Sequence, residues 1–134
     1  MLYMLDTNIC IYLIKSKSKL LLDRFKQCKP GEVGISTVTL AELRFGVAKS
    51  KFLKQNTAAL NAFLPPLEIA SFDEQAAGVY GMVRAELEAA GTPIGPLDTM
   101  IGGHALSLGA SLISNNVGEL GRIKDLQVLD WSLA

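Results

Sequence analysis

Hydrophobic residues follow two patterns along this chain, short continuous runs and a repeat of three to four residues. The runs are typical of buried strands and occupy residues 2–5, 33–35, 67–70, 111–113 and 127–129. The helical repeat lies between them, over residues 7–14, 20–28, 37–47, 52–64, 71–91 and 98–108. Strands that alternate with helices predict an α/β/α sandwich around a mainly parallel sheet of about five short strands. We expect residues 1–134 to form a single domain.

Several helix ends can be predicted from local chemistry. Ser71 is followed by an acid at position 74, which matches a capping box and predicts that the longest helix begins after Ser71. Gly91 ends that helix, and a loop rich in Pro and Gly covers residues 92–97. Asp98 can then cap the next helix, since Asp is a preferred N-cap residue.

The composition indicates a protein with apolar surface to cover. Hydrophobic residues make up 49% of the chain and the mean hydropathy is +0.29, so we expect another chain to bury part of the surface. No apolar stretch approaches the 18 or so residues of a membrane span. The first apolar run has no basic segment before it and meets Asp6 directly, which indicates a strand, not a signal peptide. We therefore expect a cytoplasmic protein without a membrane partner.

Charge and metal-binding residue types narrow the chemistry. Ten of the 13 Lys and Arg residues lie in residues 1–54, a distribution that either neutralises phosphates or reflects solvated helix faces; charge alone favours the second reading. Cys10 and Cys28 lack the CxxC spacing and are expected to be reduced thiols. A single histidine argues against zinc, so any metal should be a hard ion held by oxygen.

Four acids fall where parallel strands place working residues, at the carboxyl ends of the strands. They are Asp6, Glu42, Asp98 and Glu119. Each has a structural alternative: Asp6 and Asp98 can cap helices, Glu42 can be an exposed helix position, and Glu119 alone is unremarkable. Together they would repel one another unless a cation neutralised them. Mg²⁺ or Mn²⁺ meets that need and can activate water for displacement at a phosphodiester.

Several segments form an ordered series along nearly the whole chain. The series begins with residues 4–12, Met-Leu-Asp-Thr-Asn-Ile-Cys-Ile-Tyr, and continues at residues 35–43 with Gly46. It then includes residues 84–87, residues 91–98, His104-Ala105 and Asn115-Asn116 leading to Glu119, and it ends at Asp130-Trp131. In this series the chain resembles PIN-domain toxins of the VapC type.

The resemblance implies a metal-dependent ribonuclease that is held inactive by an antitoxin encoded beside it. It implies Mg²⁺ as the cofactor with Mn²⁺ as a substitute, an RNA substrate such as a structured loop of tRNA or rRNA, a VapB-type antitoxin, a homodimer and a toxin–antitoxin hetero-oligomer. Helix capping is the alternative role for Thr7 and Asn8. The implied site comprises metal ligands Asp6 and Asp98, catalytic Glu42 and Glu119, Thr7 and Asn8 orienting Asp6 or a water, and Asn116 acting similarly near Glu119.

The chain departs from the family pattern in two places. Gly102 and Gly103 stand where the family commonly has alanines, at a cost of roughly 1–2 kcal/mol if both are ordinary helix interior. Gly118 and Leu120 flank Glu119, where the family usually has a basic or polar residue and a phenylalanine. His104 lies six residues after Asp98, about 240° around the helix, and is expected to be structural.

Two other classes of function are open to a strand-end aspartate. A non-catalytic RNA- or protein-binding PIN-like module could use the acidic cleft and basic stripe, but an RNA-binding groove gains nothing from four acids. A phosphatase of the haloacid dehalogenase type needs a second acid two residues after Asp6, where this chain has Asn8. A receiver domain needs an aspartate at the third strand, which residues 67–70 lack. The ribonuclease is therefore the leading hypothesis.

Overall fold

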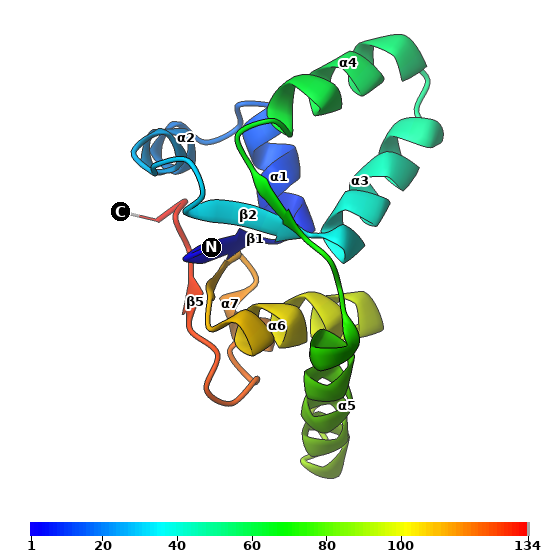
Figure 1. The fold of residues 1–134 in the computed structure, drawn as a ribbon, viewed down its shortest axis with the longest axis vertical. Helices are drawn as coiled ribbons and strands as arrows, with labels where there is room; N and C mark the ends of the chain where they lie inside the picture. The colour runs from blue at the N-terminus through cyan, green and yellow to red at the C-terminus, as the bar shows by residue number, and fades with distance from the viewer. Residues whose placement is uncertain (134) are drawn as a thin grey trace.

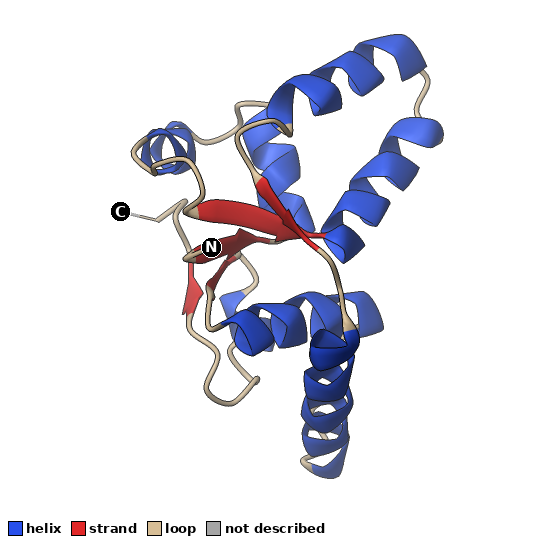
Figure 2. Cartoon of the chain, viewed as in Figure 1, coloured by secondary structure: helices blue, strands red, loops and turns tan. Residues whose placement is uncertain are grey.

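The computed structural model describes residues 1–133 and contains a single five-stranded sheet, coloured red in Figure 2. All neighbouring strands are parallel, in the order β3-β2-β1-β4-β5. The strands are β1 (Tyr3–Leu5), β2 (Val33–Ser36), β3 (Glu68–Ala70), β4 (Ser111–Ile113) and β5 (Val128–Leu129). The predicted α/β fold with five short parallel strands is confirmed.

Helices connect the strands and cover both faces of the sheet (Figure 1). They are α1 (Thr7–Ile14), α2 (Lys19–Lys26), α3 (Thr37–Ala48), α4 (Leu53–Phe63), α5 (Glu74–Ala89), α6 (Pro96–Leu108) and α7 (Val117–Leu120). In Figure 1, α1 to α4 lie above the sheet, whereas α5, α6 and α7 lie below it. The sequence pattern did not predict α7, because a single turn of helix is too short to show a hydrophobic repeat.

The two layers correspond to two hydrophobic cores that share the strands. Met4 and Leu5 are adjacent in β1, and because strand side chains alternate between faces they enter different cores. Leu5 joins buried residues of α1 to α4, while Met4 joins those of α5, α6 and the segment around α7. Leu112 and Ile113 divide in the same way in β4. The central strands are therefore buried on both faces, which explains their uninterrupted apolar runs.

The start of the longest helix differs from the prediction. The N-cap of α5 is Asp73, whose carboxylate accepts a hydrogen bond from the Ala76 N–H at 2.9 Å, so the capping box at Ser71 was wrong. The Phe72 N–H donates instead to the Thr37 hydroxyl at 3.0 Å. This tertiary contact holds residues 71 and 72 outside the helix and delays its start.

The helix that carries Asp98 begins earlier than predicted. Pro96 is its first residue and Gly95 its N-cap, so Asp98 lies in the first turn and is not itself the cap. Proline at this position suits a helix start, because its missing N–H would have had no partner there. The N-terminal end of α6 also favours the negative charge of Asp98.

Close packing accounts for the two consecutive glycines of α6. A Cβ added at Gly102 would lie 2.5 Å from the buried Ile123 Cδ1, and one at Gly103 would lie 3.3 Å from the Tyr80 Cα of α5. These positions are therefore contact points at which α6 meets α5 and the segment after α7, not ordinary helix interior. The glycines allow that close approach. The helix-propensity cost given above for glycine in an ordinary helix interior therefore does not apply to them.

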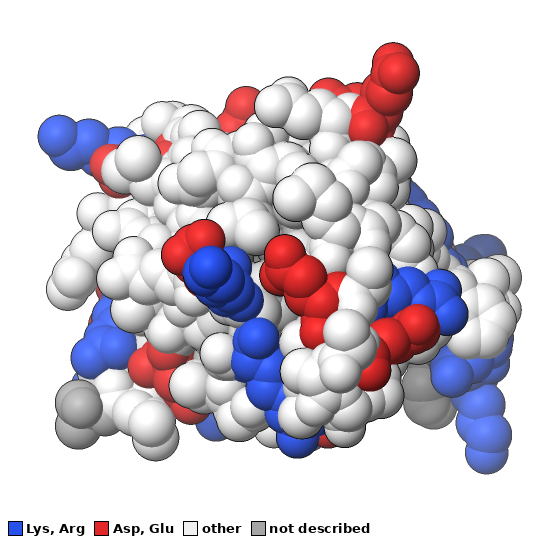
Figure 3. All heavy atoms as spheres, turned by 90° about the horizontal axis from the view of Figure 1, so that it is seen from below, with Lys and Arg blue, Asp and Glu red and all other residues white. Residues whose placement is uncertain are grey.

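The described surface carries both signs of charge and two free thiols. Within residues 1–133, Cys10 and Cys28 are both unpaired, as expected. On the face seen from below in Figure 3, acidic and basic side chains are interspersed over a largely uncharged surface. The basic excess of residues 1–54 belongs to α1 to α4 and their connections, on the opposite side of the sheet from α5. Among residues 1–133 no helix combines the length and the apolar character of a membrane span.

Candidate active site

Asp6 lies at the carboxyl end of β1 and also begins α1. Its backbone N–H donates to the Ile113 carbonyl at 3.1 Å, because β1 and β4 pair with Leu5 opposite Ile113. Its Oδ1 accepts a hydrogen bond from the Ile9 N–H at 2.9 Å, so Asp6 is the N-cap of α1. The side chain is only 6% exposed. Capping and membership of the acidic site are therefore compatible roles, since the second carboxylate oxygen is not used by the cap.

Glu42 reaches the site from α3 and is held there by α1. The Thr7 hydroxyl donates to Glu42 Oε1 at 2.6 Å and lies 3.4 Å from the Thr39 hydroxyl. Thr7 was expected to orient Asp6 or a water; its contact in the structure is with Glu42 instead. Asn8 follows on α1 and lines the same hollow as Glu42.

Asp98 and Glu119 come from the other layer of the fold. Asp98 is half-buried in the first turn of α6. Glu119 lies on α7, where its Oε2 accepts a hydrogen bond from the Asn116 side-chain amide at 3.2 Å. The contact expected between Asn116 and Glu119 is therefore present. The short helix α7 turns the segment after β4 back toward the sheet edge.

The electrostatics show that the four acids share one neighbourhood. Burial is the main cause that raises the pKa of Asp6, and the charges of Asp98 and Glu42 raise it further. Burial also raises the pKa of Asp98, with added repulsion from Glu42 and Glu119. Carboxylates that oppose one another's ionisation in this way gain from a nearby cation.

The donor set fits a hard divalent cation. No three His, Cys, Asp or Glu side chains within residues 1–133 are arranged to hold a metal ion together. Mg²⁺ does not require such a cage, because it commonly binds one or two carboxylates and completes its octahedron with water and substrate phosphate. Asp6 and Asp98, both with raised pKa values, offer that kind of oxygen ligand.

Ser114 is a polar residue of the site that the sequence reasoning missed. It directly follows β4, is completely buried, and accepts a hydrogen bond from the Asn116 N–H at 2.9 Å; its hydroxyl partly offsets the raised pKa of Asp6. The sequence signal for Ser114 was its position directly after an apolar strand. Because Leu5 of β1 pairs with Ile113 of β4, the residues that follow them, Asp6 and Ser114, come from neighbouring strand ends. A serine is common enough after a strand that the signal becomes specific only when the strand order is known.

A large hollow of about 830 Å³ opens beside Glu42. Its lining combines polar site residues with apolar and basic ones, including Thr7, Asn8, Glu42, Phe45, Lys49 and Leu97. Lys49 Nζ lies 5.0 Å from the centre of the exposed Phe45 ring. Glu42 therefore adjoins a recess with room for an extended ligand.

A second groove runs between α1, α3 and α4. It has a volume of about 270 Å³ and is lined mainly by aliphatic side chains, among them Ile11, Ile14, Leu43, Val47 and Leu60. Glu42 lines this groove as well as the hollow beside it. A segment lying in the groove could therefore contact Glu42.

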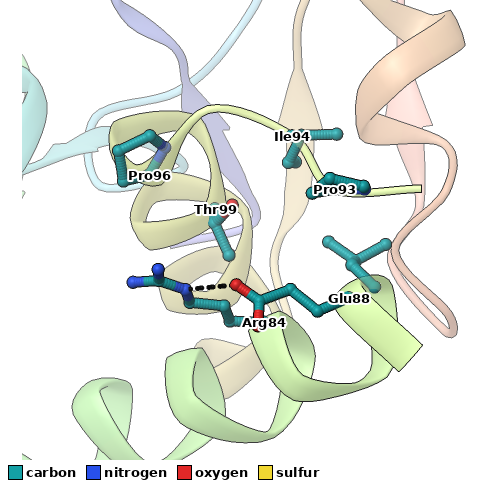
Figure 4. Close-up of a pocket in the computed structure, with 7 residues that line it drawn as sticks. Arg84, Glu88, Pro93, Ile94, Pro96 and Thr99 are labelled. Carbon is teal, nitrogen blue, oxygen red and sulfur yellow. Dashed lines mark hydrogen bonds and ion pairs between the residues drawn. The ribbon is translucent and has the colours of Figure 1, made fainter. Parts of the chain in front are cut away.

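The loop that leads to Asp98 borders a small cavity of about 180 Å³, shown in Figure 4. Arg84 Nε of α5 forms an ion pair with Glu88 at 3.0 Å on one side of it. Across the cavity, the Thr99 hydroxyl donates to the Gly95 carbonyl at 2.8 Å. Arg122, just after α7, donates to the Pro93 carbonyl at 3.3 Å. These bonds fix the loop and hence the start of α6.

Comparisons with known proteins agree with this geometry. Residues 3–125 match the family model described as PIN domain. The chain is 42% identical to a tRNA(fMet)-specific endonuclease VapC of Shigella flexneri, over 97% of this chain and 98% of that protein. It is 41% identical to ribonuclease VapC2 of Rickettsia felis, over 98% of both. A solved structure of DNA-bound VapBC from Salmonella typhimurium contains a chain that superposes with a TM-score of 0.92 at 43% identity, covering 98% of this chain and 99% of that one.

Proposed function

This chain belongs to the PIN-domain family, and we propose that it is a metal-dependent endoribonuclease, the toxin of a type II toxin–antitoxin pair. The observation that carries the proposal is the meeting of four carboxylates from four separate elements, two of them with raised pKa values. Full-length identity above 40% to VapC ribonucleases supports the same reaction. In this proposal the whole chain, residues 1–134, acts as one nuclease domain.

Asp6 and Asp98 are the proposed metal ligands, with Mg²⁺ as the ion and Mn²⁺ as a substitute. Both are hard oxygen donors, and neutralisation by a cation would relieve the burial and repulsion that raise their pKa values. When bound, the ion would activate a water and stabilise negative charge on the phosphate. Glu42 and Glu119 complete the proposed catalytic set from the α3 and α7 sides.

The remaining residues of the site hold these acids in place. The Thr7 hydroxyl fixes one oxygen of Glu42 and leaves the other free to accept a proton or a hydrogen bond from water. Asn116 restrains Glu119 in the same way. Asn8, on the lining of the hollow, is placed to contact the RNA backbone or an ordered water. Because Asp6 is almost fully buried, bulk water has little access to that side of the site.

The proposed substrate is RNA, in particular a structured loop of tRNA or rRNA. The Shigella flexneri relative is named as specific for tRNA(fMet), which favours tRNA. A hollow of about 830 Å³ can admit an unpaired segment, whose bases splay out more readily than those of a duplex. Lys49 on its lining supplies a positive charge for phosphate.

The proposed inhibitor is a VapB-type antitoxin that lies in the apolar groove between α1, α3 and α4. The groove offers several aliphatic contacts and includes Glu42 in its lining, where a basic antitoxin residue would meet this carboxylate. We also propose a homodimer, because large apolar side chains outside the RNA hollow, such as Phe52 and Met82, are 68% and 66% exposed and leave apolar surface for a second chain to cover. Cytoplasmic location follows from the proposed RNA substrate and antitoxin.

End-mapping of cellular RNA after induction without the antitoxin tests this function. We expect new 5′ ends at a few discrete positions, concentrated in one class of structured RNA. The same induction of Asp98→Asn, which should retain the fold, should give none of these ends. Identical ends from both proteins would show that the cleavage comes from another enzyme and would overturn the proposal.

A further inference from the structure

Gly102 lies on the face of α6 that also carries Asp98. The two residues are four positions apart, and residues with that spacing are neighbours on one face of a helix. The segment that includes and follows α7 packs against this face. The side chains nearest to a Cβ added at Gly102 are Ile123, Leu120 and Leu126. The distance between α7 and Asp98 therefore depends on how closely this segment can approach Gly102.

A side chain at position 102 would have no room. The added Cβ would lie 2.5 Å from Ile123 Cδ1, well inside the ordinary contact range of 3.4–4 Å. Ile123 is only 2% exposed, and the neighbouring Leu120 is 1% exposed, so neither side chain points into solvent. In a close-packed interior, an extra methyl group forces side chains or backbone to shift.

The segment that would shift carries Glu119. The Arg122 N–H donates to the Glu119 carbonyl at 3.0 Å, and the Ile123 N–H donates to the Leu120 carbonyl at 3.2 Å. Leu120 directly follows Glu119 in α7. These bonds join Ile123 to the turn that holds Glu119, so a displacement of Ile123 is passed on to this carboxylate.

Asp98 is held independently of that segment. The Thr99 hydroxyl and N–H both donate to the Gly95 carbonyl, at 2.8 and 2.9 Å, and fix the first turn of α6. The helix α6 also packs along α5, whereas α7 is a helix of only four residues. A methyl group at position 102 would therefore displace α7 and the residues after it more than the start of α6.

We propose that Gly102 is a positioning residue that sets the separation of Glu119 from Asp98 by allowing α7 and the following residues to dock closely on α6. The proposal rests on the proposed metal-dependent ribonuclease function and adds to it a residue outside the four acids. Catalysis is sensitive to such placement, because a misplacement of about 1 Å can lower a rate roughly 100-fold.

The test uses variants of the full chain. Gly102→Ala introduces the methyl group, and Ile123→Val in the same chain removes the Cδ1 atom that this methyl group would meet. Ile123→Val alone is the reference for that rescue. Gly81→Ala is the matched control, because it makes the same change in α5 where an added Cβ has no atom within 4 Å.

Two quantities are measured for each variant. The first is the single-turnover rate of RNA cleavage in Mg²⁺. The second is the Mg²⁺ concentration that gives half of the rise in melting temperature, which reports binding of the ion without catalysis. A change that affects only the fold would lower the melting temperature and leave both quantities as they are in wild type.

We expect Gly102→Ala to cleave RNA roughly 100-fold more slowly and to need roughly 10-fold more Mg²⁺. Gly81→Ala should match wild type in both measurements. The double variant should return to the level of Ile123→Val alone. A Gly102→Ala protein with the wild-type rate and Mg²⁺ response, even if it melts lower, would overturn the proposal.

Combination with Glu119→Gln shows whether the effect passes through Glu119. If Gly102 acts by placing this carboxylate, Gly102→Ala should slow the Glu119→Gln protein less than about 3-fold further. An equal loss in both backgrounds would overturn the proposal.

The double variant carries the test if Gly102→Ala alone cannot be purified. A folded double variant with the rate of Ile123→Val supports the contact, and an unfolded or inactive one overturns it. Failure of wild type itself to cleave RNA would count against the ribonuclease function instead, and the Mg²⁺ dependence of melting would still test Gly102.

Discussion

His104 Nδ1 lies 2.8 Å from the Ser36 hydroxyl oxygen, and both residues are almost completely buried. Ser36 ends β2 and is the N-cap of α3, which carries Glu42, whereas His104 belongs to α6, which carries Asp98. The bond therefore ties together the helices that bring two of the acids to the site. The sequence indicated that His104 faces away from the metal, and this buried contact gives it a structural role.

Replacement of His104 by leucine should lower stability. The side chain is of similar size, but the Ser36 hydroxyl loses its buried hydrogen-bond partner, which costs about 1–3 kcal/mol in the free energy of unfolding. Urea unfolding at pH 7.5 measures the change. A difference from wild type below about 0.5 kcal/mol would show that the hydrogen bond contributes little.

The same variant tests a pH dependence. Burial lowers the pKa of His104 from 6.5, so below that pH the unfolded chain binds more protons than the folded one. Wild type should therefore lose stability through this group as the pH falls below 6.5, and His104→Leu should lack that component. Parallel melting curves from pH 5 to 8 provide the comparison.

Thr7 and Glu42 provide a prediction about catalysis. Thr7→Val removes the hydroxyl that holds Glu42 Oε1 at 2.6 Å while retaining the β-branched shape, so we expect single-turnover cleavage to slow about 10–100-fold. Thr7→Ser retains the hydroxyl and should stay within a few-fold of wild type. Wild-type cleavage by Thr7→Val, with a loss only in Thr7→Ser, would show that the methyl group matters and the hydrogen bond does not.

The apolar groove predicts where antitoxin inhibition is lost. Ala59 lines the groove on α4, whereas the neighbouring Ala58 is exposed and does not. Ala59→Glu should place a charge among aliphatic side chains and weaken inhibition by the antitoxin at least 10-fold, with cleavage unchanged. Ala58→Glu is the matched control and should be inhibited normally. The measurement is the antitoxin concentration that halves RNA cleavage by each variant.

Crowding of the carboxylates should make the metal-free protein less stable as the pH rises. Asp6 and Asp98 have pKa values raised above 3.8 in the folded state, so the folded chain binds more protons than the unfolded chain in that window. Stability in EDTA should fall as the pH rises from about 4 through the raised pKa values and then level off, and Mg²⁺ should restore it. Asp98→Asn should melt no lower than wild type in EDTA and gain less from Mg²⁺. If Asp98→Asn melts well below wild type in EDTA, the charge of Asp98 mainly stabilises the N-terminus of α6.

Much of the fold could be predicted because the central strands are buried on both faces. Uninterrupted apolar runs such as Tyr3–Leu5, of which the first three are each followed by a helical repeat, leave few alternatives to a parallel sheet. The ends of these runs also located Asp6. The gathering of all four acids at one edge depends on strand order, which the α/β pattern narrowed but did not determine.

The parts that could not be predicted depend on tertiary contacts. The capping box at Ser71 was locally sound, but the bond from Phe72 to Thr37 delays the helix to Asp73. Gly102 looked like a weak point of α6 until its packing against Ile123 was visible. The partner of Thr7 depended on how α1 meets α3, which no pattern within either helix records.

A paired cleavage assay tests whether Asp6 belongs to a metal-dependent centre for RNA cleavage. Purified wild type and Asp6→Asn, matched by folded content, are incubated with the same tRNA pool in Mg²⁺ and in EDTA. We predict cleavage by wild type in Mg²⁺ only, and a rate for Asp6→Asn at least 100-fold lower, a loss of about 2.7 kcal/mol in transition-state stabilisation. Undiminished Mg²⁺-dependent cleavage by well-folded Asp6→Asn would show that Asp6 is not part of the metal-dependent centre.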